Sequence, residues 1–261
     1  MNSSKDWNPH AYLQFRNERT QASIDLVNRI QIDFSPQNII DIGCGPGNSS
    51  QVLMHRWPQA ELLGLDSSKN MIEKAKSDLP QYTWIQADAS SFQSEKKFDI
   101  VFSNATIQWI PDHDNLLRIF SSLLSDRGVL AFQIPLFNDM PVSKTIELVA
   151  IDNRWRSRVE HCRNLFTFHD YSYYYDRLSM NFDSIELWET HYIHVLDSHS
   201  AIIDWIKSTG LKPYLDNLEN GDEKLLFENL MLNEIKKKYP LQENGKVLFP
   251  FKRLFAIAKK N

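Results

Sequence analysis

Short apolar segments alternate with amphipathic ones through the first half of the chain. Runs typical of buried strands occupy residues 39–42, 62–66, 82–88, 98–103 and 128–133. Between them lie segments of helical periodicity; the clearest carries an apolar stripe from Leu116 to Leu124, and we expect it to end at Gly128. Alternation of this kind predicts an α/β fold with a parallel, doubly wound sheet and helices on both faces.

The second half of the chain is more helical and is rich in aromatic and arginine residues. Helical patterns near 137–180, 198–209 and 222–238 are interrupted by strand patterns at 184–195 and 247–258, so the sheet is expected to have seven strands, mostly parallel. No linker composition separates these segments. We therefore predict one domain, 1–261, with its core at about 30–135, 181–196 and 245–261, and a helical cap or lid over the carboxyl ends of the strands at about 1–20, 136–180 and 197–240.

Composition excludes several classes of protein. Hydrophobic residues make up 42% and charged residues 24% of the 261 residues, as in ordinary globular proteins. Lys and Arg number 29 against 33 Asp and Glu, and a net charge of −4 argues against nucleic-acid binding. No apolar run has the length of a membrane span, and Met1–Asp6 lacks a signal-peptide pattern. Cys44 and Cys162 alone cannot form a disulfide framework, so we expect a cytoplasmic location. We also expect a monomer.

A glycine-rich turn follows the first predicted strand. Gly43, Gly45 and Gly47 permit a tight turn and a close approach of the backbone to a ligand, and the next helix directs its positive end there. Asp66 ends the second strand and Asp88 the third, where carboxylates can accept hydrogen bonds from ribose hydroxyls and an adenine amino group. Acids at successive strand ends predict a nucleoside site at this edge of the sheet.

The spacing of the glycines bears on which nucleoside binds. The dinucleotide pattern Gly-x-Gly-x-x-Gly fails at Asn48 or at Ser50, depending on which glycine begins it, which counts against an NAD-dependent oxidoreductase. Asp41 would repel a pyrophosphate but attract a sulfonium ligand. The sequence Asp41-Ile-Gly-Cys-Gly-Pro-Gly47 resembles motif I of the class I S-adenosylmethionine-dependent methyltransferases.

This resemblance implies a Rossmann-like fold and S-adenosylmethionine as cofactor. It implies that Asp41 helps to hold the methionine amino group and that Asn104 flanks the transferred methyl group. The full set of cofactor-binding residues that it implies is Asp41, Gly43, Gly45, Gly47, Asn48, Asp66, Ser67, Met71, Asp88, Ala89 and Asn104.

Further segments resemble the trans-aconitate 2-methyltransferases in particular. They are Trp7-Asn8-Pro9, Gln108-Trp-Ile-Pro-Asp-His113 and Tyr239-Pro-Leu-Gln-Glu-Asn-Gly245. The resemblance spans nearly the whole chain, is weakest at residues 137–180, and implies esterification of a carboxylate of a small organic acid. The candidate residues for binding this acid are Trp7, Tyr12, Arg16, Gln108, Trp109, Tyr174, Trp205, Thr209 and Arg253.

The implied reaction needs little acid–base chemistry. A carboxylic acid is already ionised at pH 7, so we expect no general base, no catalytic triad and no metal; alignment of the reacting groups, near Asn104 and Trp109, supplies the catalysis. His191 and His194 lie on opposite faces of a strand and cannot chelate together. Arg154, Arg156, Arg158 and Arg163 are either an anion-steering patch or a solvated helix face. The alternatives are methylation of another carboxylate, such as a malonyl thioester on a carrier protein, and a non-catalytic sensor of the cofactor.

Overall fold

The computed structural model describes residues 6–260. The chain divides into two compact units: unit 1 comprises Met1–Pro135, Thr167–Thr190 and Leu254–Asn261, and unit 2 comprises Leu136–Phe166 and His191–Arg253. Residues 1–5 lie outside the described residues. They include most of Met1–Asp6, where no signal-peptide pattern was found, and the start of the expected lid. The expected single domain with a lid stays a prediction.

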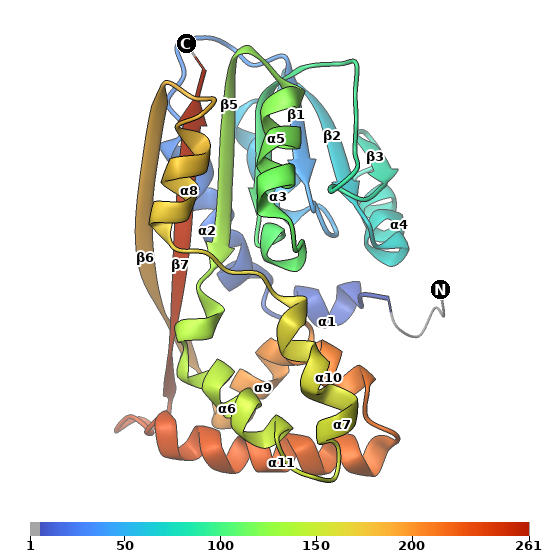
Figure 1. The fold of residues 1–261 in the computed structure, drawn as a ribbon, viewed down its shortest axis with the longest axis vertical. Helices are drawn as coiled ribbons and strands as arrows, with labels where there is room; N and C mark the ends of the chain where they lie inside the picture. Colours follow the sequence, from blue (N-terminus) through green and yellow to red (C-terminus); the bar gives the residue numbers. More distant parts are fainter. Residues whose placement is uncertain (1–5, 261) are drawn as a thin grey trace. The chain divides into compact units, whose positions relative to one another are not determined.

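The strands form one sheet of seven in the order β3-β2-β1-β4-β5-β7-β6. Their bounds are β1 Asn38–Ile42, β2 Glu61–Asp66, β3 Thr83–Gln86, β4 Phe98–Asn104, β5 Leu124–Pro135, β6 Ser184–Leu196 and β7 Val247–Lys259. Strands β1 to β5 pair in parallel, whereas β7 runs in the opposite direction to β5 (Figure 1). The predicted fold class is therefore confirmed, and both late strands form as expected.

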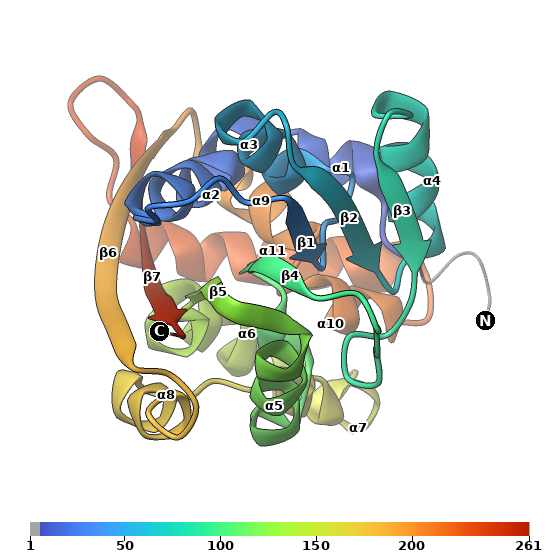
Figure 2. The same cartoon turned by 90° about the horizontal axis from the view of Figure 1, so that it is seen from above.

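Helices α3, α4, α5, α9 and α11 lie where helical periodicity was predicted, whereas α2 and α10 were not predicted. Their bounds are α1 Pro9–Leu13, α2 Arg16–Arg29, α3 Asn48–Arg56, α4 Lys69–Asp78, α5 His113–Leu123, α6 Pro141–Ala150, α7 Arg156–Val159, α8 Tyr171–Leu178, α9 His199–Lys207, α10 Lys212–Asp216 and α11 Gly221–Lys238. Within unit 1, α2 and α3 cover one face of the sheet and α5 and α8 the other (Figure 2). This is the doubly wound arrangement, which places the carboxyl ends of the parallel strands along one edge.

One predicted boundary is wrong. Helix α5 ends at Leu123, and Gly128 lies inside β5 instead of ending the helix. The register explains the difference, because Phe98 on β4 pairs with Leu124 and Ile100 pairs with Val129, so β5 carries extra residues in a bulge. A Cβ on Gly128 would stand 2.8 Å from Leu124 Cδ2, so the bulge requires glycine there.

The core of unit 1 lies on both faces of its parallel strands. Ile39, Ile40 and Phe102 are fully buried, as continuous apolar strands predict. Trp84 on β3 fills the space above two glycines: a Cβ on Gly64 would stand 2.3 Å from its ring, and one on Gly47 would stand 3.2 Å away. One indole thus wedges β2, β3 and the glycine turn together.

Unit 2 is built from α6, α7, α9, α10 and α11 with the adjoining parts of β6 and β7. Its core is aromatic: Trp155 packs on Phe227, and Trp205 packs on Phe249 and Phe251. Helix α11 begins at a side-chain cap, since Asn220 accepts hydrogen bonds from the backbone of Asp222 and Glu223. None of the helices within residues 6–260 is long and apolar enough to span a bilayer.

Candidate functional site

The glycine turn joins β1 to α3 through three residues in the left-handed region. Gly43, Gly45 and Gly47 have φ values of 72°, 54° and 95°. A Cβ on Gly43 would stand 2.0 Å from Thr106 Oγ1, whereas one on Gly45 would meet no atom within 4 Å. Gly43 is therefore required by packing, and Gly45 lines open space that a ligand can fill.

Asp41 lies at the end of β1, completely buried beneath the turn. Its Oδ2 accepts hydrogen bonds from the hydroxyls of Ser49 and Ser50, both at 2.6 Å, while Oδ1 accepts none from the described residues. Burial raises the pKa of Asp41 from 3.8 to about 6, and the two serine hydrogen bonds oppose part of this rise. A cation placed at the turn would favour the ionised carboxylate.

Asp66 ends β2 beside the same turn. Its carboxylate accepts from the backbone N–H of Gly45 at 2.9 Å and from that of Ser68 at 2.8 Å, so it shapes the turn and the start of α4 together. Burial raises the pKa of Asp66, and these backbone hydrogen bonds oppose the rise. Helix α4 is capped by Ser68, whose hydroxyl accepts a hydrogen bond from the N–H of Met71. Met71 is buried, whereas Ser67 is exposed and does not cap the helix.

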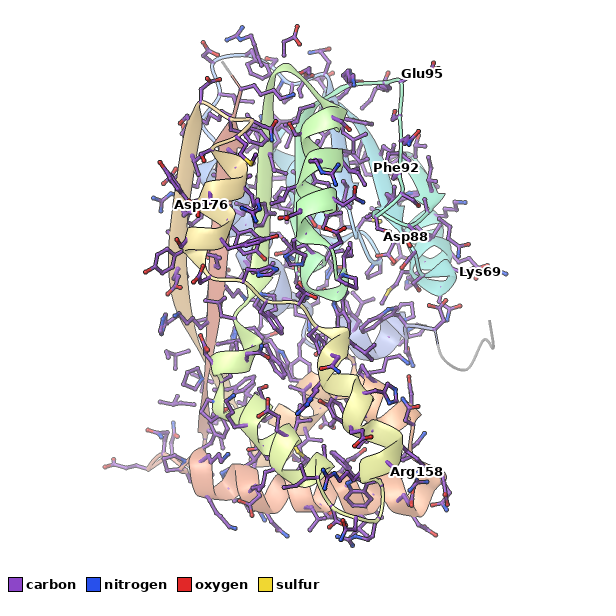
Figure 3. The ribbon with its side chains drawn as sticks, viewed as in Figure 1. Lys69, Asp88, Phe92, Glu95, Arg158 and Asp176 are labelled. Carbon is purple, nitrogen blue, oxygen red and sulfur yellow. The ribbon has the colours of Figure 1, made fainter. Side chains whose placement is uncertain are left out.

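The third predicted acid is arranged differently. Asp88, labelled in Figure 3 in the segment after β3, is exposed, and its Oδ1 accepts from the backbone N–H and the hydroxyl of Ser90 at 2.8 and 2.7 Å. Ala89 beside it is buried. The other carboxylate oxygen, Oδ2, takes no part in these two hydrogen bonds, so Asp88 can still accept a hydrogen bond from a ligand.

The segment after β4 completes this edge of unit 1. Asn104 ends the strand with its Oδ1 buried and without a hydrogen-bond partner among the described residues. Thr106 donates its hydroxyl proton toward the carbonyl of Gly43 or of Asn104, each at 3.2 Å, which ties this segment to the glycine turn. The amide of Gln108 folds back on the carbonyl of Ala105 at 2.7 Å.

Two of the predicted acceptor residues meet in unit 1. The rings of Trp7 and Trp109 pack edge to face with centroids 5.0 Å apart. Asn70 at the start of α4 holds the N-terminal segment, because its side chain donates to the carbonyl of Trp7 at 3.1 Å and its backbone N–H donates to Asp6 at 3.0 Å. The structure thereby brings this segment to the same edge as Asp66.

The other predicted residues of this part of unit 1 make local contacts. Asn48 contacts Thr20 Oγ1 at 3.5 Å, and exposed Arg16 hydrogen-bonds Gln51 on α3. The ring of Tyr12 lies 4.3 Å from the Arg19 guanidinium. These contacts hold α1 and α2 against α3.

Tyr174 does not lie at an acceptor surface. It is fully buried in unit 1, its ring packs on Phe132 with centroids 5.3 Å apart, and its hydroxyl hydrogen-bonds His113 Nδ1 at 2.9 Å. All of its polar capacity is thus used within the fold, and we leave it out of the acceptor site proposed below.

Trp205, Thr209 and Arg253 belong to unit 2. Trp205 and Arg253 are buried, and the Arg253 guanidinium lies 4.5 Å from the centroid of Phe251. Thr209 contacts the carbonyl of Trp205 at 3.5 Å. Within unit 2, Trp205 and Arg253 therefore share one aromatic cluster around Phe251.

The arginine-rich segment is largely neutralised within unit 2. Arg154 pairs with Asp152 at 2.5 Å, Arg156 with Glu160 at 3.9 Å, and Arg158, labelled in Figure 3, with Glu223 at 2.8 Å. Paired charges produce little field at a distance, so the structure favours the solvated-face interpretation over an anion-steering patch.

Sequence reasoning missed several residues of the site. Ser49 and Ser50 could have been found, because the first turn of the helix after the glycines must place hydroxyls near the strand-end acid. Thr106 and Asn70 carried no signal, since their partners Gly43 and Trp7 are 63 residues away in the chain.

Comparison with known proteins matches the chain to the methyltransferase domain family over residues 13–211. It is 40% identical over 255 residues to a trans-aconitate 2-methyltransferase of Escherichia coli O157:H7 (strain EC4115 / EHEC), and 39% identical to that of Shigella flexneri, in each case over 98% of both chains.

Solved structures with a related fold include the YcgJ protein from Bacillus subtilis, with a TM-score of 0.61, 17% identity and coverage of 92% of this chain and 99% of that one. Another is phosphoethanolamine N-methyltransferase 2 from Haemonchus contortus in complex with S-adenosyl-L-methionine, with a TM-score of 0.60, 16% identity and coverage of 97% and 57%. These likenesses confirm the Rossmann-like methyltransferase fold.

Proposed function

Because the chain belongs to the trans-aconitate 2-methyltransferase family, we propose that it methylates a carboxylate oxygen of trans-aconitate. It is an S-adenosylmethionine-dependent methyltransferase, and S-adenosylhomocysteine is the other product. The observation that carries the proposal within the structure is the pair of acids, buried Asp41 and half-buried Asp66, at one glycine-lined edge of the sheet.

The residues at this edge fit the cofactor. Asp41 Oδ1 and Asn104 Oδ1 are buried acceptors without partners among the described residues, and the space beside Gly45 is open. The cofactor carries an ammonium group, ribose hydroxyls and an adenine amino group, all of which donate hydrogen bonds to such acceptors. We assign the ammonium group to Asp41, the ribose to Asp66, and the adenine to Asp88 with Met71 and Ala89.

The protein contributes to the reaction by binding and alignment. When bound, S-adenosylmethionine supplies an electrophilic methyl group on a positively charged sulfur. Asp41 and Asp66 neutralise positive charge at the turn, and Asn104 and the packed pair Trp7 and Trp109 restrict the position of the acceptor and exclude water. Since the acceptor is already a carboxylate at pH 7, no side chain has to remove a proton.

The acceptor has charges that the reaction does not consume. A tricarboxylate keeps two carboxylates away from the reacting oxygen, and these require cationic or hydrogen-bonding donors. Within unit 1 we propose Arg16 and Tyr12 for this role, with Gln108 as a further wall. For Arg253, Thr209 and Trp205 of unit 2, binding of the acid remains a prediction from the sequence. Cytoplasmic location and a monomeric state remain predictions from the sequence.

The proposal is tested with the purified enzyme and radiolabelled S-adenosylmethionine. Labelled ester is measured after incubation with trans-aconitate, with cis-aconitate and citrate as related acids, and with a malonyl thioester on a carrier protein. We expect the highest kcat/KM with trans-aconitate. Binding of S-adenosylhomocysteine without ester from any small acid would contradict the substrate assignment, and ester from the carrier-bound thioester alone would support the alternative.

A further inference from the structure

The segment after β4 has a strained backbone. Among the described residues other than glycine, only Ala105 has a positive φ, which is 54°. A side-chain-bearing residue holds this conformation only where its surroundings fix it, and such residues concentrate at functional sites. Asn104 and Trp109 flank Ala105 in this segment, so its shape determines where both side chains lie.

Backbone contacts fix part of the segment. The N–H of Ala105 donates to the carbonyl of Gln133 on β5 at 2.9 Å, and the N–H of Thr167 donates to the carbonyl of Gln108 at 2.8 Å. Residues 107–109 form the short 3-10 helix η2, Ile107–Trp109. Between these two anchors, the carbonyl of Ile107 accepts from the N–H of Ile110 at 3.0 Å and is also held by a side chain.

That side chain is His113, the first residue of α5. Its Nε2 lies 2.8 Å from the carbonyl of Ile107, and its Nδ1 lies 2.9 Å from the hydroxyl of Tyr174. Because a carbonyl only accepts, Nε2 must carry the proton. Burial lowers the pKa of His113, so the ring is neutral at pH 7 and has a single proton. Nδ1 therefore accepts from the Tyr174 hydroxyl.

Tyr174 is placed for this task by α8. Its ring is fully buried against Phe132 and stacks on His113 with centroids 5.9 Å apart. Helices α5 and α8 lie on the same face of the sheet, so the pair is internal to unit 1 (Figure 2).

We propose that His113 and Tyr174 are positioning residues. The Tyr174 hydroxyl fixes the buried imidazole of His113 in the Nε2–H tautomer. The imidazole in turn holds the Ile107 carbonyl, and with it the strained segment that carries Asn104 and Trp109. The inference rests on the proposed function for its kinetic consequence, but the tautomer and the rigidity of the segment are independent of turnover.

The kinetic test uses three variants that remove one or both of the His113 contacts. Tyr174→Phe removes only the hydroxyl and should lower kcat about tenfold, as expected for the loss of one buried hydrogen bond. His113→Leu removes both nitrogens and should lower kcat on the order of 100-fold, since misplaced groups lose alignment. His113→Gln keeps an amide N–H near the Ile107 carbonyl and should stay within about threefold of wild type. KM for S-adenosylmethionine should change little throughout.

The second test measures the segment directly. NMR of the imidazole nitrogens should show His113 neutral with its proton on Nε2. Hydrogen exchange of the backbone amides of Ala105 and Trp109 should accelerate in Tyr174→Phe and His113→Leu, and return to the wild-type rate in His113→Gln, while Ile100 within β4 is unchanged.

Two results would overturn the proposal. One is an Nδ1–H tautomer in the wild-type protein. The other is an equal acceleration of all these amides with unchanged kcat, which would reduce the pair to ordinary core packing. If the wild-type enzyme forms no ester but the amides respond as expected, the proposed function fails and the positioning role of the pair stands.

Discussion

The strand-end acids of unit 1 differ from the arginine-rich part of unit 2 in how their charges are balanced. In unit 1, Asp41 is buried and Asp66 is half-buried, and no basic side chain among residues 6–260 forms an ion pair with either. In unit 2, Arg158 pairs with Glu219 and Glu223, and Lys212 pairs with Asp216. The charge of these two carboxylates is thus not balanced by an ion pair, whereas these charges of unit 2 are balanced by local partners.

This difference indicates where a bound ligand contributes to the stability of the protein. Burying an unpaired carboxylate is unfavourable, and folds retain such a group where a bound cation or hydrogen-bond donor pairs with it. Ion pairs near the surface add little to stability and leave nothing for a ligand to complete. Changes in unit 1 should therefore alter stability and cofactor affinity together, while changes to ion pairs in unit 2 should alter neither much.

The largest expected effect separates two neighbouring glycines of the turn. Gly43→Ala adds a Cβ 2.0 Å from Thr106 at a positive φ, and should lower the free energy of unfolding by roughly 2–5 kcal/mol. Gly45→Ala has open space around its Cβ and should cost only about 1–2 kcal/mol from the backbone, but should weaken cofactor binding. Chemical denaturation and calorimetric titration with S-adenosylhomocysteine distinguish them. Equal stability losses would contradict the packing role of Gly43.

An intermediate effect concerns the buried acid. The pKa of Asp41 is raised from 3.8 to about 6, so this group lowers the free energy of unfolding as pH rises from about 4 to 6. Asp41→Asn should therefore stabilise the cofactor-free protein at pH 7 by up to about 3 kcal/mol, at 1.36 kcal/mol per pKa unit, and the gain should vanish near pH 4.

The same substitution should weaken cofactor binding. Wild-type affinity for S-adenosylhomocysteine should rise with pH through about 6, because the ammonium group binds the ionised carboxylate, and the variant should lose this dependence. Thermal unfolding and titrations between pH 4 and 8 measure both quantities. Asp176→Asn, at an exposed site on α8, is the control and should keep the wild-type pH dependence; loss of that dependence in the control as well would show that the effect does not come from Asp41.

The smallest expected effect tests unit 2. Arg158→Met keeps the apolar stem and removes the ion pairs with Glu219 and Glu223. The unfolding midpoint should fall by about 4 °C or less, and kcat/KM for trans-aconitate should stay within about twofold of wild type. A large rise in KM for the acid would revive the anion-steering interpretation of this segment.

The sequence analysis succeeded where short-range patterns determine structure. Apolar runs located the strands of the sheet, and Asp41, Asp66 and the glycines between them were placed at one edge because they follow strands that pair in parallel. The same logic misassigned Gly128, since a bulge and a helix end both call for glycine and the pairing of Phe98 with Leu124 is invisible in the sequence.

Long-range contacts set the limit of such prediction for side chains. Tyr174 sits in a run of tyrosines whose spacing does not reveal which hydroxyl turns inward, and its partner His113 is 61 residues away. The arginine-rich segment is similar, because the acids that pair with Arg158 lie beyond residue 218. The role of a polar residue is decided by partners that only the fold brings near.

The Trp84 wedge has a consequence for how the sequence can diverge. A Cβ added at Gly64 would stand 2.3 Å from its indole, so Gly64 is constrained by an aromatic residue on the neighbouring strand. Gly47 is constrained independently, because its φ of 95° strains any side chain and Leu79 Cδ1 would stand 2.7 Å from the added Cβ. Substitution at Gly64 therefore becomes permissible only after the tryptophan has been replaced by something smaller, which restricts the order of mutations at positions 64 and 84.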